Sequence, residues 1–207
     1  MSVATKISRD ERRALILESA RNSFVNRGYH ATSMEDIAES AGISKPVVYQ
    51  HFDSKLDLYL DLLESSCEGL ENAVAEALAS TNENKQRVAR AVGAYFDFIE
   101  EDRGSYQLIF EGDLPTEPLV SARIEKSNDV CGRLIAVVIS EDTGLSAEEA
   151  LLLGSGLIGS AQTAARQWFK SKSAIPKSEA KRLVSALTWR GISSFPMSHP
   201  ATNEGVN

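Results

Sequence analysis

The spacing of apolar residues is the feature that most constrains the fold of this chain. Along nearly its whole length, apolar side chains recur every three or four positions, as Ile16, Ala20 and Phe24 do. This is the period of a helix with one buried face. No segment alternates apolar and polar residues like a half-buried strand, and no internal repeat interrupts the pattern. The sequence therefore predicts an all-α fold.

Glycines, prolines and short polar segments divide this pattern into separate helices. Thr32 precedes Glu35 by three residues, and Ser146 precedes Glu149 in the same way. This spacing is typical of a capping box at the start of a helix. The predicted helices cover residues 9–27, 33–41, 45–52, 55–78, 86–102, 119–140, 146–169 and 178–195.

The composition is that of an ordinary globular protein, with 43% hydrophobic and 25% charged residues among 207. No apolar run approaches the roughly 20 residues needed to span a bilayer. The first residues also lack the apolar core of a secretory signal. Cys67 and Cys131 stand far apart without a partner motif, which favours reduced thiols over a disulfide or a zinc site. We expect a cytoplasmic protein with no membrane partner and no metal.

The net charge of −7 does not exclude a nucleic-acid partner, because the acidity is unevenly distributed. Residues 1–55 contain eight Lys or Arg and seven Asp or Glu, so the acidic excess lies in the rest of the chain. A DNA contact needs only a local patch of positive charge. The N-terminal part of the chain is therefore the place to look for one.

Residues 33–52 have the layout of a helix-turn-helix, with a short helix, a turn at Gly42 and a second short helix. The segment ISKPVVYQHFDSK, residues 43–55, is rich in hydrogen-bond donors. An ordinary solvated helix face carries more carboxylates, and a core helix carries fewer donors. The alternative is a helical hairpin inside an all-α core.

In such a motif the second helix enters the major groove, and its neighbours hold phosphates. Lys45 would meet a guanine edge or a phosphate, and Val47 a thymine methyl group. Tyr49 and His51 would donate to phosphates without adding a fixed charge. The predicted DNA-binding residues are Thr32, Ser33, Ser44, Lys45, Pro46, Val47, Tyr49, Gln50, His51 and Lys55.

The stretch YHATSMEDIAESAGISKPVVYQHFDSKLDLYLDLLE resembles the DNA-binding domain of TetR-family transcriptional regulators. It has their Gly-aromatic step at Gly28–Tyr29, their A-G-x-S turn ending at Ser44, and the motif Y-x-H-F-x-S-K ending at Lys55. The resemblance implies a homodimer that binds a palindromic DNA operator and responds to a hydrophobic small molecule. It also implies an N-terminal helix-turn-helix domain followed by a helical effector-binding and dimerisation domain. The expected divisions are residues 1–55 for DNA binding, 56–195 for effector binding and dimerisation, and 196–207 for a disordered tail.

Residues 95–118, YFDFIEEDRGSYQLIFEGDLPTEP, resemble a group within that family, the FasR-like regulators of fatty-acid synthesis in actinobacteria. This resemblance implies regulation of lipid genes, no bound cofactor, and a long-chain acyl-CoA as effector. An apolar stripe at helical spacing is plain core by default, and that reading stays open for each residue. The predicted ligand-binding residues are Tyr95, Phe96, Ile99, Tyr106, Leu108, Ile109, Phe110, Leu157, Ile158 and Trp168.

The resemblance further implies a dimer interface on the last two long helices, where TetR-family proteins form a four-helix bundle. Gly156, Ser160 and Ala164 form a row of small residues that lets two helices approach closely, and Leu187 joins them as a predicted interface residue. The segment GSGLIG, residues 154–159, also fits a dinucleotide-binding pattern. That pattern requires a preceding strand, and a helix is expected there instead, which argues against a cofactor.

Other functions compete with this reading. An all-α enzyme or lipid carrier would need titratable groups converging in a tunnel, and no nucleophile or phosphate-loop motif occurs. A helical adaptor for protein partners would not show the steep salt dependence of phosphate contacts. A TetR-family repressor of efflux or catabolism genes would sense a different hydrophobic molecule. We expect a regulator rather than an enzyme, and the sequence leaves its operator and the sign of regulation open.

Overall fold

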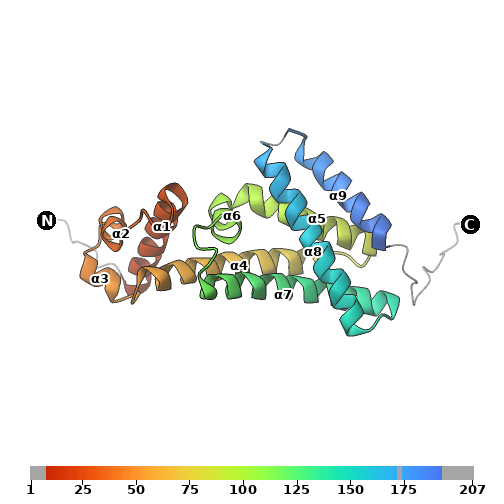
Figure 1. Cartoon of the computed structure of the whole chain (residues 1–207), viewed down its shortest axis with the longest axis horizontal. Coiled ribbons are helices and arrows are strands. Elements are labelled where there is room, and N and C mark those ends of the chain that lie inside the picture. Colours follow the sequence, from red (N-terminus) through yellow and green to blue (C-terminus); the bar gives the residue numbers. More distant parts are fainter. Residues whose placement is uncertain (1–7, 172–173, 193–207) are drawn as a thin grey trace, which may run out of the picture. The chain divides into compact units, whose positions relative to one another are not determined.

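The computed structural model describes residues 8–171 and 174–192, and in these residues the chain forms only helices (Figure 1). The predicted all-α fold is therefore confirmed. The predicted tail at residues 196–207 lies outside the described residues. The helices are α1 (Arg9–Arg27), α2 (Met34–Ala41), α3 (Lys45–Tyr49), α4 (Lys55–Ala79), α5 (Asn84–Glu101), α6 (Arg103–Phe110), α7 (Pro118–Thr143), α8 (Ala147–Lys170) and α9 (Lys177–Ile192).

The chain divides into two compact units. Unit 1 contains the residues up to Cys67 together with Asp102–Ile124, and unit 2 contains Glu68–Glu101 and the residues from Glu125 onward. Helices α4 and α7 contribute to both units. The predicted boundary at residue 55 separates DNA binding from effector binding, whereas these units are defined by compactness. The functional boundary therefore stays a prediction.

In unit 1, the predicted apolar stripes are buried. Ile16 and Phe24 of α1 are 0% and 5% exposed, and Val48 of α3 is fully buried. Phe52, which follows α3, is also buried, so its predicted inward direction is confirmed. These side chains fix α1, α2 and α3 as neighbours, which lie together in Figure 1.

The start of α2 differs from the prediction by one residue. Ser33 is the N-cap, and its hydroxyl accepts a hydrogen bond from the backbone N–H of Asp36 at 3.1 Å. The Asp36 carboxylate accepts the backbone N–H of Ser33 at 2.8 Å, which completes the capping box. The predicted Thr32–Glu35 box is wrong because the Thr32 hydroxyl donates instead to the carbonyl of Gly28 at 2.8 Å.

A short helix, α6, follows α5, whose end at Glu101 lies one residue from the predicted end at residue 102. Helix α6 itself was not predicted from the sequence. The Asp102 carboxylate caps it by accepting the backbone N–H of Ser105 at 2.9 Å. Within unit 1, Arg21 of α1 donates to both Asp102 oxygens at 3.2 Å. These contacts fix the first turn of α6 against α1.

Unit 2 is organised around α5, which packs against α8 and α9 (Figure 1). The predicted capping box of Ser146 and Glu149 at the start of α8 is confirmed. Helices α7 and α8 lie close together at Gly154, where an added Cβ would lie 2.4 Å from the carbonyl oxygen of Gly132. The core of this unit is therefore a set of helices packed backbone to backbone in places.

Candidate DNA-binding surface and ligand cavity

The first candidate surface is formed by α2, the turn after it and α3. Gly42 adopts the left-handed conformation, with φ 64° and ψ 30°, and its N–H donates to the carbonyls at the end of α2. The helix α3 then begins at Lys45, with Ser44 as N-cap. Because Val48 is fully buried, its side chain fixes the inner face of α3 against the core of unit 1. The helix-turn-helix layout predicted for residues 33–52 is present.

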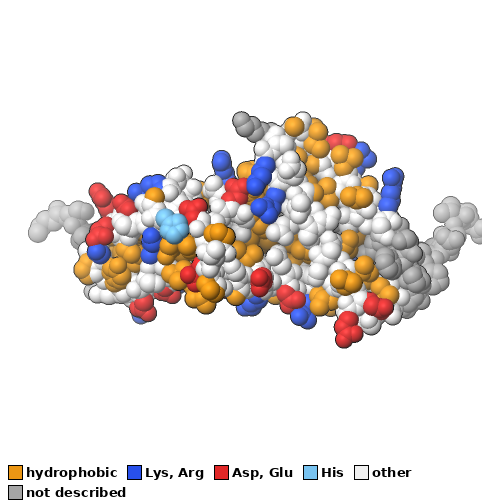
Figure 2. Space-filling view, in the orientation of Figure 1, with side chains coloured by type: hydrophobic (Ala, Val, Ile, Leu, Met, Phe, Trp, Pro, Cys, Tyr) orange, Lys and Arg blue, Asp and Glu red, His pale blue; other side chains and the backbone are white. Residues whose placement is uncertain are grey.

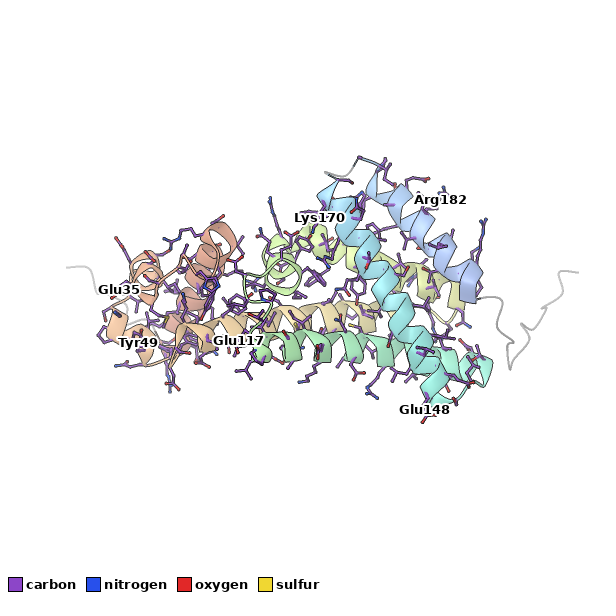
Figure 3. The ribbon with its side chains drawn as sticks, in the orientation of Figure 1. Glu35, Tyr49, Glu117, Glu148, Lys170 and Arg182 are labelled. Atoms are coloured by element: carbon purple, nitrogen blue, oxygen red, sulfur yellow. The ribbon has the colours of Figure 1, made fainter. Side chains whose placement is uncertain are left out.

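The outer face of α3 carries most of the predicted contacts. Figure 3 shows Tyr49 on α3 and Glu35 on the neighbouring α2. The Tyr49 side chain is 43% exposed, although the adjacent Val48 is fully buried. Of the other predicted residues, Ser44, Lys45, Pro46 and Gln50 are exposed, and Val47 and His51 are half-buried. This face offers hydroxyl, ammonium, amide and ring donors to a ligand in solution.

A carboxylate on α2 holds Lys45. The Lys45 ammonium donates to Glu35 Oε1, and both side chains are well exposed. This hydrogen bond raises the pKa of Lys45. An exposed ion pair is weak and exchanges readily with other partners. Glu35 therefore competes with any phosphate or base edge that approaches Lys45.

Replacing Glu35 by glutamine is expected to strengthen DNA binding about three- to tenfold at low salt. The change removes a negative charge beside α3 and releases the Lys45 ammonium for a phosphate. Fluorescence anisotropy with one duplex at two salt concentrations measures the effect. Glu39→Gln, which alters an exposed carboxylate on the same helix, is the matched control. An equal gain in both variants, or none in Glu35→Gln, would contradict the specific competition for Lys45.

Three arginines of α1 that the sequence analysis left out lie near His51. Partial burial and then the positive charges of Arg9, Arg12 and Arg13 lower the pKa of the His51 ring. This shift favours the neutral ring, which can donate one N–H. Arg13 is also paired with Asp61 at 2.7 Å. Arg9 and Arg12 add positive charge to the part of the candidate surface around His51.

Three of the predicted DNA-binding residues hold the turn between α1 and α2. Thr32 is 1% exposed, and Ser33 caps α2. The Lys55 ammonium, at the start of α4, donates to the carbonyl oxygens of Tyr29 and Thr32 at 2.9 Å and 2.8 Å. It also lies 4.2 Å from the centre of the Tyr29 ring. These contacts favour a positioning role for the three residues, and their contact with DNA stays a prediction.

Tyr29 contacts three different parts of unit 1: α1, α4 and the loop after α6. Its backbone N–H donates to Asp113 Oδ2 at 3.0 Å, and its ring lies 5.7 Å from that of Phe24 and 5.4 Å from that of Tyr59. The preceding Gly28 has φ 81° and ψ 166°, a conformation that only glycine adopts without strain. A cavity of about 240 Å³ adjoins this junction. The start of the helix-turn-helix is thus tied to the loop after α6.

The second candidate site is an apolar cavity inside unit 2. Its volume is about 130 Å³, well above the roughly 10–15 Å³ that one water molecule requires. Its apolar lining consists of Leu78, Val88, Ala91, Val92, Ile135, Val138, Ile139, Leu157, Ile158, Ala161 and Trp189. Its polar lining consists of Asn84, Arg87, Asp142, Thr143 and Thr188.

Of the ten predicted ligand-binding residues, Leu157 and Ile158 line this cavity. The others are placed elsewhere in the two cores, and their contact with a ligand stays a prediction. In unit 2 the buried ones are Tyr95, Phe96, Ile99 and Trp168. In unit 1 they are the buried Tyr106, Leu108 and Ile109 and the half-buried Phe110 of α6.

Exposed apolar side chains gather on α8 and α9. Leu152 is 75% exposed and Leu187 is 69% exposed, and orange hydrophobic atoms are visible over these helices in Figure 2. Nothing lies within 4 Å of a Cβ added at Gly156. Of the predicted interface residues, Gly156, Ser160 and Leu187 are exposed and Ala164 is half-buried. This face is suited to a second helical surface, and its role as an interface stays a prediction.

In the residues that the structure describes, no group of three or more His, Cys, Asp or Glu side chains is placed to hold a metal ion. Cys67 and Cys131 are buried. Within the same described ranges, no helix combines the length and the apolar character needed to cross a membrane.

Comparisons with known proteins identify similar sequences and similar folds. Residues 16–62 match the family described as "Bacterial regulatory proteins, tetR family". The HTH-type transcriptional activator FasR of Mycolicibacterium smegmatis is 43% identical over 192 residues, which cover 93% of this chain and 88% of that protein. A solved TetR-family regulator from Streptomyces coelicolor has a TM-score of 0.71 at 24% identity, over 94% of this chain and 84% of that one. The regulator FadR from Bacillus subtilis, solved with stearoyl-CoA, has a TM-score of 0.71 at 15% identity, over 84% and 96%.

Proposed function

Because this chain belongs to the TetR family of bacterial regulatory proteins and is therefore a DNA-binding transcriptional regulator, we propose that it controls genes of fatty-acid and lipid metabolism in response to a long-chain acyl-CoA. It acts in the cytoplasm as a homodimer on a palindromic operator. The observation that carries the proposal is the likeness to FasR over 93% of the chain. The apolar cavity of unit 2 supports the effector class.

The DNA-binding step follows from the outer face of α3. Lys45, Val47 and Tyr49 enter the major groove, where the first two read base edges. His51 and the arginines at the start of α1 hold the phosphates on either side. Loss of Tyr49 therefore weakens binding to every sequence, whereas loss of Lys45 or Val47 also relaxes the sequence preference.

The effector step follows from the cavity. Its lining is mostly aliphatic, which suits an acyl chain. A cavity of about 130 Å³ holds only part of a long chain, so the lining helices have to move apart. The ligand then binds the two conformations unequally, which is the condition for shifting the population between them. Helix α4, which belongs to both units, carries the change toward unit 1.

The dimer is proposed to form through the exposed face of α8 and α9. Replacing Leu187 by glutamate is expected to weaken the dimer by more than tenfold, because a buried interface contact becomes a buried charge. Analytical ultracentrifugation of the full chain measures the dissociation constant. Val137→Glu on α7, where the side chain is 57% exposed, is the matched control and leaves the dimer intact. Equal sedimentation of Leu187→Glu and the parent would place the interface elsewhere.

The test of the whole proposal is fluorescence anisotropy on duplexes from upstream of fatty-acid synthase genes and of the gene for this protein. Acyl-CoAs of increasing chain length are titrated into the complex at fixed salt, and the affinity is also measured against added salt. A long chain should alter the affinity while a short chain does not. Specific DNA binding that ignores every acyl-CoA would retain the regulator and favour another hydrophobic effector, as in control of efflux or catabolism.

A further inference from the structure

Thr188 carries a buried hydroxyl that has no hydrogen-bond partner among the residues the structure describes. The residue is 6% exposed, lies near the end of α9 and lines the cavity of unit 2. A buried hydroxyl in a helix ordinarily donates to the carbonyl one turn back. Thr143, in the same cavity, does so with Ile139 at 2.6 Å. An unmet buried hydroxyl is costly, so its persistence requires an explanation.

The position of Thr188 along the cavity follows from the direction of α9. Near the start of α9, the Lys177 and Lys181 ammonium groups bind Glu100 and Asp97, which lie near the end of α5. The two packed helices therefore run antiparallel, as Figure 1 also shows. The last turns of α9, with Thr188, lie beside the first turns of α5.

The cavity consequently has a polar end and an apolar body. Asn84 and Arg87, in the first turns of α5, line it together with Asp142 and Thr143 at the end of α7. Val92 and Ile158 line it farther along their helices. Of the five polar residues that line the cavity, Thr188 is the buried one, and the other four are half-buried. This arrangement suits a ligand with one polar atom at the head of a long apolar chain.

We propose that the Thr188 hydroxyl donates a hydrogen bond to the thioester carbonyl of the acyl effector. The chain extends among the aliphatic side chains beyond it, and the charged remainder of the ligand leaves at the Asn84 and Arg87 end. This inference rests on the proposed function and deepens it, because it assigns the orientation of the ligand and a residue that reads its carbonyl. A plain hydrocarbon would leave Thr188 unsatisfied and is discriminated against.

The test compares stearoyl-CoA with S-octadecyl-CoA, a thioether that lacks the carbonyl oxygen, by calorimetric titration of the full-length protein. The parent should bind the thioester about tenfold more tightly than the thioether, the difference that one hydrogen bond provides. Thr188→Val, which matches the shape of threonine, should bind the two ligands equally. Thr188→Ser should restore the preference for the thioester. The four affinities of parent and valine variant form a cycle that isolates the contact.

The melting temperature without ligand distinguishes a ligand-binding hydroxyl from one that stabilises the fold. Removal of a stabilising hydroxyl would lower the melting temperature. Thr188→Val removes an unmet polar group, so the melting temperature should stay the same or rise. The control Thr143→Val removes a hydroxyl that already donates to the carbonyl of Ile139, so its melting temperature should fall.

Each outcome separates the two proposals. If the parent prefers the thioester and Thr188→Val keeps that preference, the role of Thr188 is overturned and the acyl effector stands. If the parent binds both ligands equally, the hydrogen bond to the carbonyl is overturned in the same way. If the parent binds neither ligand, the acyl effector itself falls, and the assignment of Thr188 falls with it.

Discussion

Gly28→Ala is expected to lower the free energy of unfolding by about 2–4 kcal/mol and to weaken DNA binding. Gly28 has φ 81° and ψ 166°, which a residue with a Cβ reaches only under strain. The added Cβ would also lie 2.1 Å from Asp113 Oδ2, so the carboxylate has to leave the Tyr29 N–H that it now accepts. Chemical denaturation and anisotropy on one duplex measure the two effects.

Gly42→Ala is the control for a positive φ without a close contact, because nothing lies within 4 Å of its added Cβ and its φ 64° and ψ 30° are in the less strained left-handed helical region. It should cost only about 1–2 kcal/mol, the price of left-handed strain alone. Adding Asp113→Ala to Gly28→Ala removes the collision and leaves the strain. Equal losses for Gly28→Ala and Gly42→Ala would mean that the Asp113 contact contributes nothing to unit 1.

Gly154→Ala is expected to destabilise unit 2 by about 1–3 kcal/mol, because it overpacks a close helix crossing. The added Cβ would lie 2.4 Å from the carbonyl oxygen of Gly132 and 3.2 Å from the backbone nitrogen of Ala136. Both are main-chain atoms, which cannot rotate away as a side chain can, so α7 and α8 must separate. The midpoint of urea denaturation, followed by circular dichroism, should fall.

Gly156→Ala, two positions along the same helix, provides the opposite expectation. Nothing in the same subunit lies within 4 Å of the added Cβ, so alanine should stabilise α8 of the monomer by about 0.5–1 kcal/mol through its better helix propensity. The two variants differ only in which side of α8 receives the methyl group. A gain in stability from both would show that α7 and α8 do not approach closely at Gly154.

Features determined by neighbouring residues could be predicted from the sequence. The capping box at Ser146, the buried stripe that includes Ile16, and the inward direction of Val48 all depend on one or two turns of helix. Apolar period and cap residues carry that information directly. The helix-turn-helix was predictable for the same reason, since Gly42 supplies the left-handed residue that the turn requires.

Features that depend on distant contacts were missed. Helix α6 was not predicted, because its N-cap residue Asp102 is held by Arg21 of α1, which is distant in the sequence. Arg9 and Arg12 reach His51 only after folding, so the sequence showed them as ordinary residues of a first turn. Lys55 was predicted to bind DNA because its ammonium group is evident in the sequence. The carbonyl oxygens of the α1–α2 turn that accept its hydrogen bonds become apparent only in the folded structure.

The residues that line the ligand cavity were also hard to predict from the sequence. Helical periodicity marks which side chains turn inward, and Leu157 and Tyr95 are alike by that criterion. Whether an inward side chain borders a cavity depends on how completely its neighbours fill the space. Thr188 was not singled out, because a threonine within a helix carries no signal until its carbonyl partner is found missing.

The assembly of unit 1 from two stretches of chain bears on how such regulators can be recombined. The division between the units falls within α4 and within α7, rather than in a linker. A fragment ending at residue 55 lacks Leu58 and Tyr59, which are buried, and it lacks all of α6. Chimeras that join the sensor of one relative to the operator specificity of another therefore need crossovers inside both long helices. The segment Asp102–Ile124 must travel with the N-terminal helices.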